Sequence, residues 1–231
     1  MSAASEPRVR PRDAATLVLV RSDGEGQRVL MGQRHAGHVF MPDKFVFPGG
    51  RLDRADHRIR PVTELRPAVA DRVAVGTTPG RARALALAAV RETFEEAGLL
   101  VGARVARPQR SRSPSWRRFL AEGVAPTLDS FEFVARAITP PGNPRRYDAR
   151  FFMADASLIQ GDLHEALGGD GELLDLRWVP VGEAQSLDLP EVTHFVIDEV
   201  ARRLAMPRSQ RDGIPVPFYR FRGEKPIFGK L

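Results

Sequence analysis

The sequence contains no cysteine, which excludes disulfide bonds, thiolate metal ligands and a thiol nucleophile. Its five histidines are scattered along the chain and form no histidine-rich cluster. No run of 18 or more apolar residues occurs, so no membrane-spanning helix is expected. Any bound metal is therefore expected to have mostly oxygen ligands, which Mg²⁺ and Mn²⁺ prefer more strongly than Zn²⁺ does.

Lysine is also scarce, because only three of the 35 basic residues are lysines and the others are arginines. The net charge of +6 and a pI near 10.6 raise the question of nucleic-acid binding. The 29 acidic residues and the one-sided use of arginine favour a bias in residue usage instead, and no nucleic-acid motif is found. The densest basic cluster is interpreted as a solvated loop, part of which could meet a phosphate-rich small substrate; it comprises Arg104, Arg107, Arg110, Arg112, Arg117 and Arg118.

The length of 231 residues, without repeats or an interdomain linker, predicts a single domain over 1–231 with a sizeable core. The first residues, 1–13, mix acidic and basic side chains without an apolar core, so no secretory signal is expected. The final Gly229-Lys230-Leu231 differs from the peroxisomal Ser-Lys-Leu signal at its first residue. We therefore expect a cytoplasmic protein.

Hydrophobic patterns and turn residues predict an α/β sandwich with a mixed β-sheet. Strands are expected at 16–21, 28–34, 44–47, 131–138, 149–154 and 173–179. Helices are expected at 66–73, at 157–167, at 191–206 and over about twenty residues from Pro79, with Thr78 as the N-cap. The proline-rich residues 213–231 are interpreted as a C-terminal tail or clasp.

The most informative stretch is Arg91-Glu92-Thr93-Phe94-Glu95-Glu96-Ala97-Gly98-Leu99, at the end of the long predicted helix. It places three carboxylates at i, i+3 and i+4 on one helix face, where they repel one another and the negative end of the helix dipole. A divalent cation would reverse this repulsion; the alternative is a solvated acidic face. Arg91 lies one turn before Glu95 and can orient it, and Gly98 can end the helix in a left-handed conformation. Leu85, Ala88 and Phe94 are then expected to face the sheet.

This stretch resembles the second half of the Nudix box, with Thr93 in place of the usual aliphatic residue. The segment Phe45-Val46-Phe47-Pro48-Gly49-Gly50 is similar to its beginning. Arg91 follows Gly50 by 41 positions rather than the usual 14, so the box is split by an insertion of about 27 residues within 51–80. Asp56 stands six residues after Gly50, where the box has a glutamate, with Asp53 before it; both have either a site role or a turn role.

The resemblance implies a hydrolase that cleaves a nucleoside diphosphate linked to another group, with Mg²⁺ or Mn²⁺ as cofactor. It implies that Glu92, Glu95 and Glu96 are metal ligands or hold the ligands, and that Arg91 fixes Glu95 through a bidentate pair. It also implies that Gly49 and Gly50 let the backbone come close to metal and phosphate. Relatives often use a further glutamate before a late strand as base or ligand, for which we select Glu172; the alternative is a solvated loop acid.

The segment from Ile138 to Phe152 and the split box resemble the peroxisomal-type coenzyme A diphosphatase subgroup. Arg145 or Arg146 is then a candidate for pairing with the 3′-phosphate of coenzyme A or with the diphosphate. Asp148 and Arg150 have a second interpretation, as residues that stabilise a strand edge.

Coenzyme A or acyl-coenzyme A is the preferred substrate, giving 3′,5′-ADP and (acyl)phosphopantetheine. NADH and ADP-ribose remain open as substrates. The alternatives from other classes are a non-catalytic nucleotide-sensing Nudix domain and a nucleic-acid-binding protein, whose affinity would fall steeply with salt. We expect a small-molecule partner, no nucleic acid, no membrane, and a monomer or homodimer.

Overall fold

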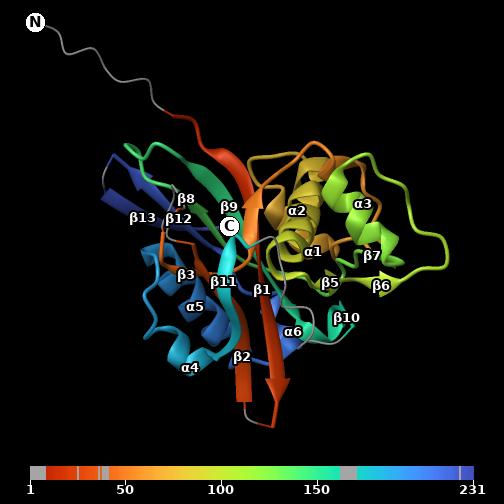
Figure 1. Cartoon of the computed structure of the whole chain (residues 1–231). Helices are drawn as coiled ribbons and strands as arrows, with labels where there is room; N and C mark the ends of the chain where they lie inside the picture. The colour runs from red at the N-terminus through yellow and green to blue at the C-terminus, as the bar shows by residue number, and fades with distance from the viewer. Residues whose placement is uncertain (1–8, 25, 36, 38–41, 162–170, 224) are drawn as a thin grey trace, which may run out of the picture.

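The computed structural model describes residues 9–24, 26–35, 37, 42–161, 171–223 and 225–231. Among them, nine strands form one mixed sheet at the centre of the molecule (Figure 1). Seven follow in the order β11-β2-β1-β9-β8-β12-β13, while β3 pairs with β2 and β4 with β1. The pairs β1–β9 and β8–β12 are parallel and the others are antiparallel. The strands are β1 (Arg12–Asp23), β2 (Gly26–Arg34), β3 (Phe45–Val46), β4 (Gly49–Arg51), β8 (Glu132–Ile138), β9 (Tyr147–Asp155), β11 (Leu173–Pro180), β12 (Pro217–Arg222) and β13 (Lys225–Lys230).

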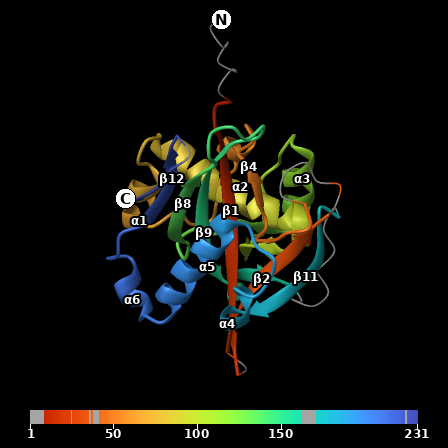
Figure 2. The ribbon, with the colours of Figure 1, turned by 90° about the vertical axis from the view of Figure 1, so that its left-hand side faces the viewer.

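Helices cover both faces of this sheet (Figures 1 and 2). The cluster that includes Leu85, Trp116 and Phe152 packs α1, α2 and α3 on one face. The cluster that includes Val18, Met153 and Val196 packs α4 and α5 on the other. This α/β/α arrangement confirms the predicted fold class. The helices are α1 (Pro67–Val73), α2 (Pro79–Ala97), α3 (Pro114–Ala121), α4 (Val181–Ala184), α5 (Glu191–Leu204) and α6 (Arg208–Arg211).

Smaller elements complete the layers. Two short two-stranded sheets lie beside the main one, and two 3₁₀ turns connect larger elements. They are β5 (Leu100–Val101) with β10 (Ile159–Gln160), β6 (Ala103–Arg104) with β7 (Val124–Ala125), η1 (Asp56–Arg58) and η2 (Ala156–Leu158). Within the described ranges, no helix is both long enough and apolar enough to cross a membrane.

The long helix α2 begins and ends where its local sequence predicts. The Thr78 side chain accepts a hydrogen bond from the Arg81 amide, and Pro79 occupies the first turn. The helix ends at Gly98, whose φ of 72° lies in the left-handed region that glycine adopts without strain. Leu85 and Ala88 are fully buried against the sheet, whereas Phe94 instead packs edge-on against Phe119 of α3.

The predicted strands all occur, some longer than expected, and helices form at 67–73 and 191–204 as predicted. The helix predicted at 157–167 is wrong in its described part. Residues 156–158 form a 3₁₀ turn, and Ile159 and Gln160 pair with β5, because this pairing satisfies their backbone groups. Residues 162–167 of that prediction lie outside the described residues.

The C-terminal residues extend the main sheet, where the sequence indicates a tail or clasp. β12 pairs in parallel with β8, and β13 turns back along β12. Val216 and Leu231 then bond to each other through their backbones, at 3.2 and 2.8 Å. Tyr219 and Phe221 point to one face of the sheet, where they join the cluster around α5. Because every second side chain of a strand points to the same face, these two rings hold the hairpin to the core.

Candidate active site

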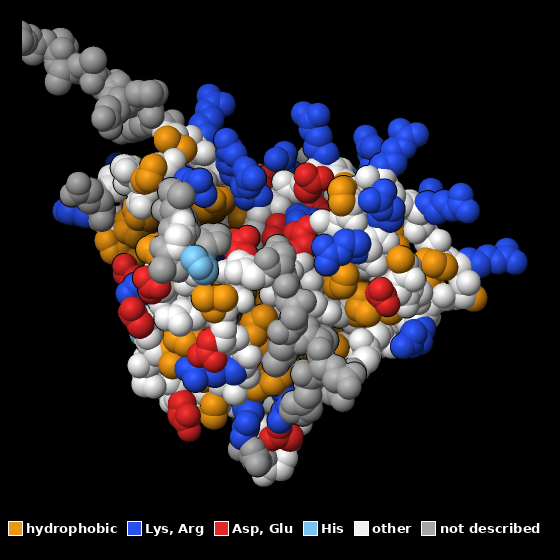
Figure 3. All heavy atoms as spheres, in the orientation of Figure 1, with side chains coloured by type: hydrophobic (Ala, Val, Ile, Leu, Met, Phe, Trp, Pro, Cys, Tyr) orange, Lys and Arg blue, Asp and Glu red, His pale blue; other side chains and the backbone are white. Residues whose placement is uncertain are grey.

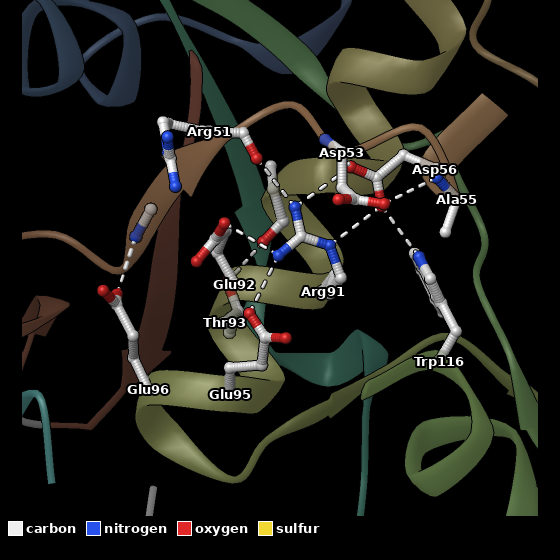
Figure 4. A network of polar contacts seen from close by, with 12 residues as sticks. Arg51, Asp53, Ala55, Asp56, Arg91, Glu92, Thr93, Glu95, Glu96 and Trp116 are labelled. Atoms are coloured by element: carbon white, nitrogen blue, oxygen red, sulfur yellow. Dashed lines mark hydrogen bonds and ion pairs between the residues drawn. The ribbon is translucent and has the colours of Figure 1, made fainter. Parts of the chain in front are cut away.

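Arg91 lies at the centre of a buried polar network that extends from α2 (Figure 4). Its side chain is 7% exposed, and its Nη1 donates to Glu92 Oε1 and to Glu95 Oε2, both at 2.8 Å. Its Nε and Nη2 donate to the two oxygens of Asp56, at 2.9 and 3.0 Å. Arg91 therefore does orient Glu95, but its bidentate partner is Asp56, which corrects the predicted pairing. Asp56 takes that place because the insertion brings it, fully buried, against α2.

The Asp56 carboxylate is held from several sides. Trp116 of α3 donates its indole N–H to Oδ1 at 2.7 Å, and the backbone N–H of Asp53 donates to Oδ2 at 2.8 Å. Asp53 itself accepts from the Ala55 amide, as turn aspartates commonly do. Asp56 is thus a residue that positions Arg91. Trp116 carries no local signal that identifies it as part of the site.

Glu96 points away from this network, toward the glycine loop. It accepts a hydrogen bond from the Gly49 backbone N–H at 2.8 Å, and the residue is 2% exposed. A Cβ on Gly50 would lie 2.5 Å from the Glu92 carboxyl carbon, and one on Gly49 would lie 2.7 Å from the Ala15 carbonyl oxygen. Gly50 therefore lets β4 approach the Glu92 carboxylate, whereas Gly49 lets β4 pack closely against β1.

A large cavity, here called the main cavity, opens beside these carboxylates and has a volume of about 870 Å³. Gly49, Gly50, Glu92 and Glu96 lie against one another in its lining. The rest of its lining comes from several strands, from α5 and from the loop between β8 and β9. Its apolar part includes Ile138, Pro140, Phe151, Val192, Tyr219 and Phe221. Figure 3 shows acidic side chains in the upper middle of one face, with Lys and Arg side chains along the edge above them.

A second space, here called the side cavity, is also lined by Glu92 and has a volume of about 690 Å³. Glu95 lines the side cavity and not the main one, while Glu92 lines both. The three carboxylates predicted on one helix face therefore separate. Glu92 lies between the other two, Glu95 turns to one cavity and Glu96 to the other.

The other predicted site residues fall into two groups. Glu172, Arg145 and Arg146 line the main cavity, so the fold brings them to the same space as Glu92 and Glu96. The Glu172 carboxylate lies 3.9 Å from Arg34 Nη1. Arg146 donates to the backbone oxygens of Thr139 and Val9, at 3.0 and 2.9 Å, which leaves Arg145 as the more available of the two.

Asp148 and Arg150 form part of a buried ion network within the sheet. Arg136 donates to both oxygens of Asp148, at 2.8 and 2.7 Å, and Arg150 donates to Asp13 at 2.9 Å. This network supports a structural role for the two residues, but within the sheet rather than at an edge, because β9 lies between β1 and β8. Thr93, the departure from the usual motif, is fully buried and donates to the Ala89 carbonyl at 2.8 Å, so its hydroxyl is satisfied within the helix.

The oxygen donors of the site fit a hard divalent cation in type, although fewer of them gather than the sequence predicts. In the described part of the chain, no three carboxylate or histidine side chains gather closely enough to hold a metal ion. Glu92 and Glu96 line the main cavity as oxygen donors, whereas Glu95 faces the side cavity and is held by Arg91. Because Mg²⁺ is commonly bound through one or two carboxylates with waters and substrate phosphates, Glu92 and Glu96 suffice as protein ligands of that kind.

Burial affects the charge state of both carboxyls. It raises the pKa of Glu92 to about 7, against the opposing effect of Arg91. Burial also raises the pKa of Glu96 well above its usual value, and the neighbouring Glu92 raises it further. The Gly49 amide acts in the opposite direction.

The metal-free protein is therefore expected to lose stability as pH rises. Glu92 has a raised pKa in the folded state, so its contribution is fully present below its unfolded value of about 4.5 and is lost as pH rises through about 7. Urea unfolding in EDTA should show the free energy of unfolding falling between pH 5 and 8. Added Mg²⁺ should restore more of it at pH 8 than at pH 5. A metal-free free energy that is constant over this range would contradict the expectation.

No protein-family model matches the chain. The chain is similar to the acyl-coenzyme A diphosphatase NUDT19 of Gallus gallus, with 28% identity over 212 residues, covering 64% of this chain. It spans 56% of the length of that protein. It is also similar to the crystal structure of a Nudix hydrolase from Alicyclobacillus acidocaldarius, with 27% identity and a TM-score of 0.61. That likeness covers 86% of this chain and 97% of the other.

Proposed function

The chain belongs to the Nudix hydrolase family, and we propose that it hydrolyses the diphosphate bond of a nucleoside diphosphate linked to a second group. One observation carries this proposal. Two carboxylates of α2, the half-buried Glu92 and the buried Glu96, line a large cavity directly against the Gly49-Gly50 backbone. Such an arrangement suits a cation and the phosphates that it binds.

We propose that Glu92 and Glu96 hold Mg²⁺ or Mn²⁺. When bound, the ion supplies charge that polarises phosphoryl oxygens and lowers the pKa of a coordinated water toward about 7. The Gly49 N–H fixes one oxygen of Glu96, and Arg91 fixes Glu92, so neither carboxylate has to be ordered when substrate binds. Glu95 contributes from the side cavity through its contact with Arg91.

Glu172 is the proposed group that accepts the proton of the attacking water. It lines the main cavity with Glu92 and Glu96, and it comes from the loop before β11 rather than from α2. Arg145, exposed at the rim of the same cavity, is proposed to contact the diphosphate, because a guanidinium matches phosphate oxygens in a bidentate way.

Coenzyme A or an acyl-coenzyme A is the proposed substrate. Its non-nucleotide half is long, and the cavity that contains Glu92 and Glu96 is also lined by an apolar wall that includes Ile138, Tyr219 and Phe221. The name of the similar chicken protein agrees with this choice. NADH and ADP-ribose are alternative substrates of the same reaction, and a sensing domain that binds without hydrolysis is the alternative function.

The direct test is to incubate the protein and Mg²⁺ or Mn²⁺ with coenzyme A, acyl-coenzyme A, NADH and ADP-ribose. Mass analysis should identify 3′,5′-ADP and (acyl)phosphopantetheine. Saturable binding without product over hours would instead support the sensing function, and cleavage of ADP-ribose alone would reject coenzyme A as the substrate.

The apolar wall of the main cavity leads to a prediction about the length of the substrate's acyl chain. Phe221→Ala should lower kcat/KM for long-chain acyl-coenzyme A by about fivefold to thirtyfold, since the contact of an aromatic wall with an apolar chain is worth on the order of 1–2 kcal/mol. ADP-ribose, which lacks such a chain, should be affected little. Phe218→Ala is the matched control, because Phe218 is on the same strand but not in the cavity lining, and its ring faces Arg136 and Arg220. Equal losses in the two variants would reject the role of the wall.

A further inference from the structure

Three arginines of the side cavity have no place in the family motif. Arg12, at the start of β1, Arg51, directly after the glycine pair, and Arg81, in the first turn of α2, line it together. All three are exposed, and they come from elements that meet where β4 pairs with β1. Arg12 and Arg51 line the main cavity as well, so these side chains and Glu92 lie where the two spaces meet.

The side cavity is lined by four arginines and four carboxylates, but these groups are not all paired with one another. Its carboxylates already have partners: Glu92 and Glu95 contact Arg91, and Asp13 contacts both Arg81 and the buried Arg150. Asp53 accepts from the Ala55 backbone. In contrast, the guanidinium groups of Arg12 and Arg51 make no hydrogen bond or ion pair with any residue that the structure describes.

The backbone of Arg51 is fixed while its side chain is not. The Arg51 carbonyl oxygen accepts a hydrogen bond from Arg91 Nη2 at 2.8 Å, and Arg51 pairs with Ala14 in the sheet. In Figure 4 this carbonyl is directed at Arg91, whereas the side chain extends away from it. Arg51 therefore presents an unpaired guanidinium from a rigid position beside Glu92.

We propose that the side cavity binds a second phosphate group of the substrate, separate from the diphosphate, through Arg12 and Arg51 with Arg81 beside them. This inference rests on the proposed function, because it assigns the 3′-phosphate of the nucleotide half of coenzyme A to this site. The diphosphate then lies between the two cavities, next to Glu92, and the apolar half extends into the main cavity. Unpaired guanidiniums on a fixed strand are suited to a phosphate monoester, which is doubly charged and accepts bidentate hydrogen bonds.

The test compares coenzyme A with 3′-dephospho-coenzyme A, which differ only in this phosphate. The protein as it stands should hydrolyse coenzyme A with a kcat/KM about tenfold or more higher, the effect of a charge-assisted contact. The double variant Arg12→Ala/Arg51→Ala should bring this ratio close to 1. Arg54→Ala, an exposed arginine three residues on and outside both cavity linings, is the matched control and should keep the ratio.

Two outcomes would overturn the inference. A ratio near 1 in the unmodified protein would show that the 3′-phosphate is not recognised. An equal loss for both substrates in the double variant would show that the arginines serve the diphosphate instead.

A binding measurement separates this inference from the proposed function. Calorimetry should show adenosine 3′,5′-bisphosphate binding about tenfold more tightly than 5′-AMP, and the double variant should lose the difference. If no substrate is hydrolysed but this difference is seen, the hydrolase proposal fails and the phosphate site stands. Equal affinities for the two nucleotides would reject the phosphate site whether or not hydrolysis occurs.

Discussion

Glu96→Gln is expected to lower turnover of the substrate about a thousandfold while the protein stays folded, since it removes the charge that holds the cation and keeps the shape. The amide oxygen of glutamine can still accept from the Gly49 N–H, so the local structure should persist. Because the pKa of Glu96 is raised by burial, removing its charge should also leave the metal-free protein at least as stable at neutral pH.

The measurement is kcat/KM at saturating Mg²⁺, with urea unfolding in EDTA on the same samples. Glu122→Gln, at an exposed position after α3, is the matched control and should change neither quantity. Glu95→Gln should have a smaller effect than Glu96→Gln, because Glu95 faces the side cavity and is held by Arg91. Retained Mg²⁺-dependent turnover in Glu96→Gln would reject the proposed site.

Arg91→Met is expected to destabilise the protein by about 3–5 kcal/mol, because it leaves the fully buried Asp56 carboxylate without its cation. Among the described residues, Trp116 and the Asp53 amide would remain as hydrogen-bond partners of Asp56, and neither carries a charge. Glu92 and Glu95 would also lose the contact that orients them, so turnover should fall with stability. Urea unfolding at pH 7 measures the loss of stability.

The double variant Arg91→Met/Asp56→Asn tests whether the unpaired Asp56 carboxylate causes the loss of stability. Removing the aspartate charge should recover part of the lost stability, so the two substitutions should not be additive. Arg83→Ala is the control on the same helix, since Arg83 pairs with Glu64 at an exposed site and should cost no more than about 1 kcal/mol. If Arg91→Met lowers the free energy of unfolding as little as Arg83→Ala does, the buried pair of Arg91 and Asp56 is not important for stability.

The acidic turn was predictable from sequence because its determinants are adjacent in the chain. Thr78 and Pro79 begin the helix, Gly98 ends it, and the spacing of Glu92 from Glu95 and Glu96 depends only on helix geometry. The spacing did not predict that the three side chains line two different cavities. Their directions are decided by the partners on either side, Arg91 for Glu95 and the Gly49 amide for Glu96.

The sequence by itself predicted the resemblance to the family, the capped helix with its carboxylates, the glycine pair and the positions of the strands along the chain, because each follows from short segments of the chain. Only the tertiary structure decided that Asp56 holds Arg91, that Trp116 supports it, and that the C-terminal hairpin walls the main cavity. These contacts join residues separated by an insertion or by most of the chain. Which residues meet depends on how the loops bring distant segments together and on which side chains become buried, and local sequence patterns do not encode either.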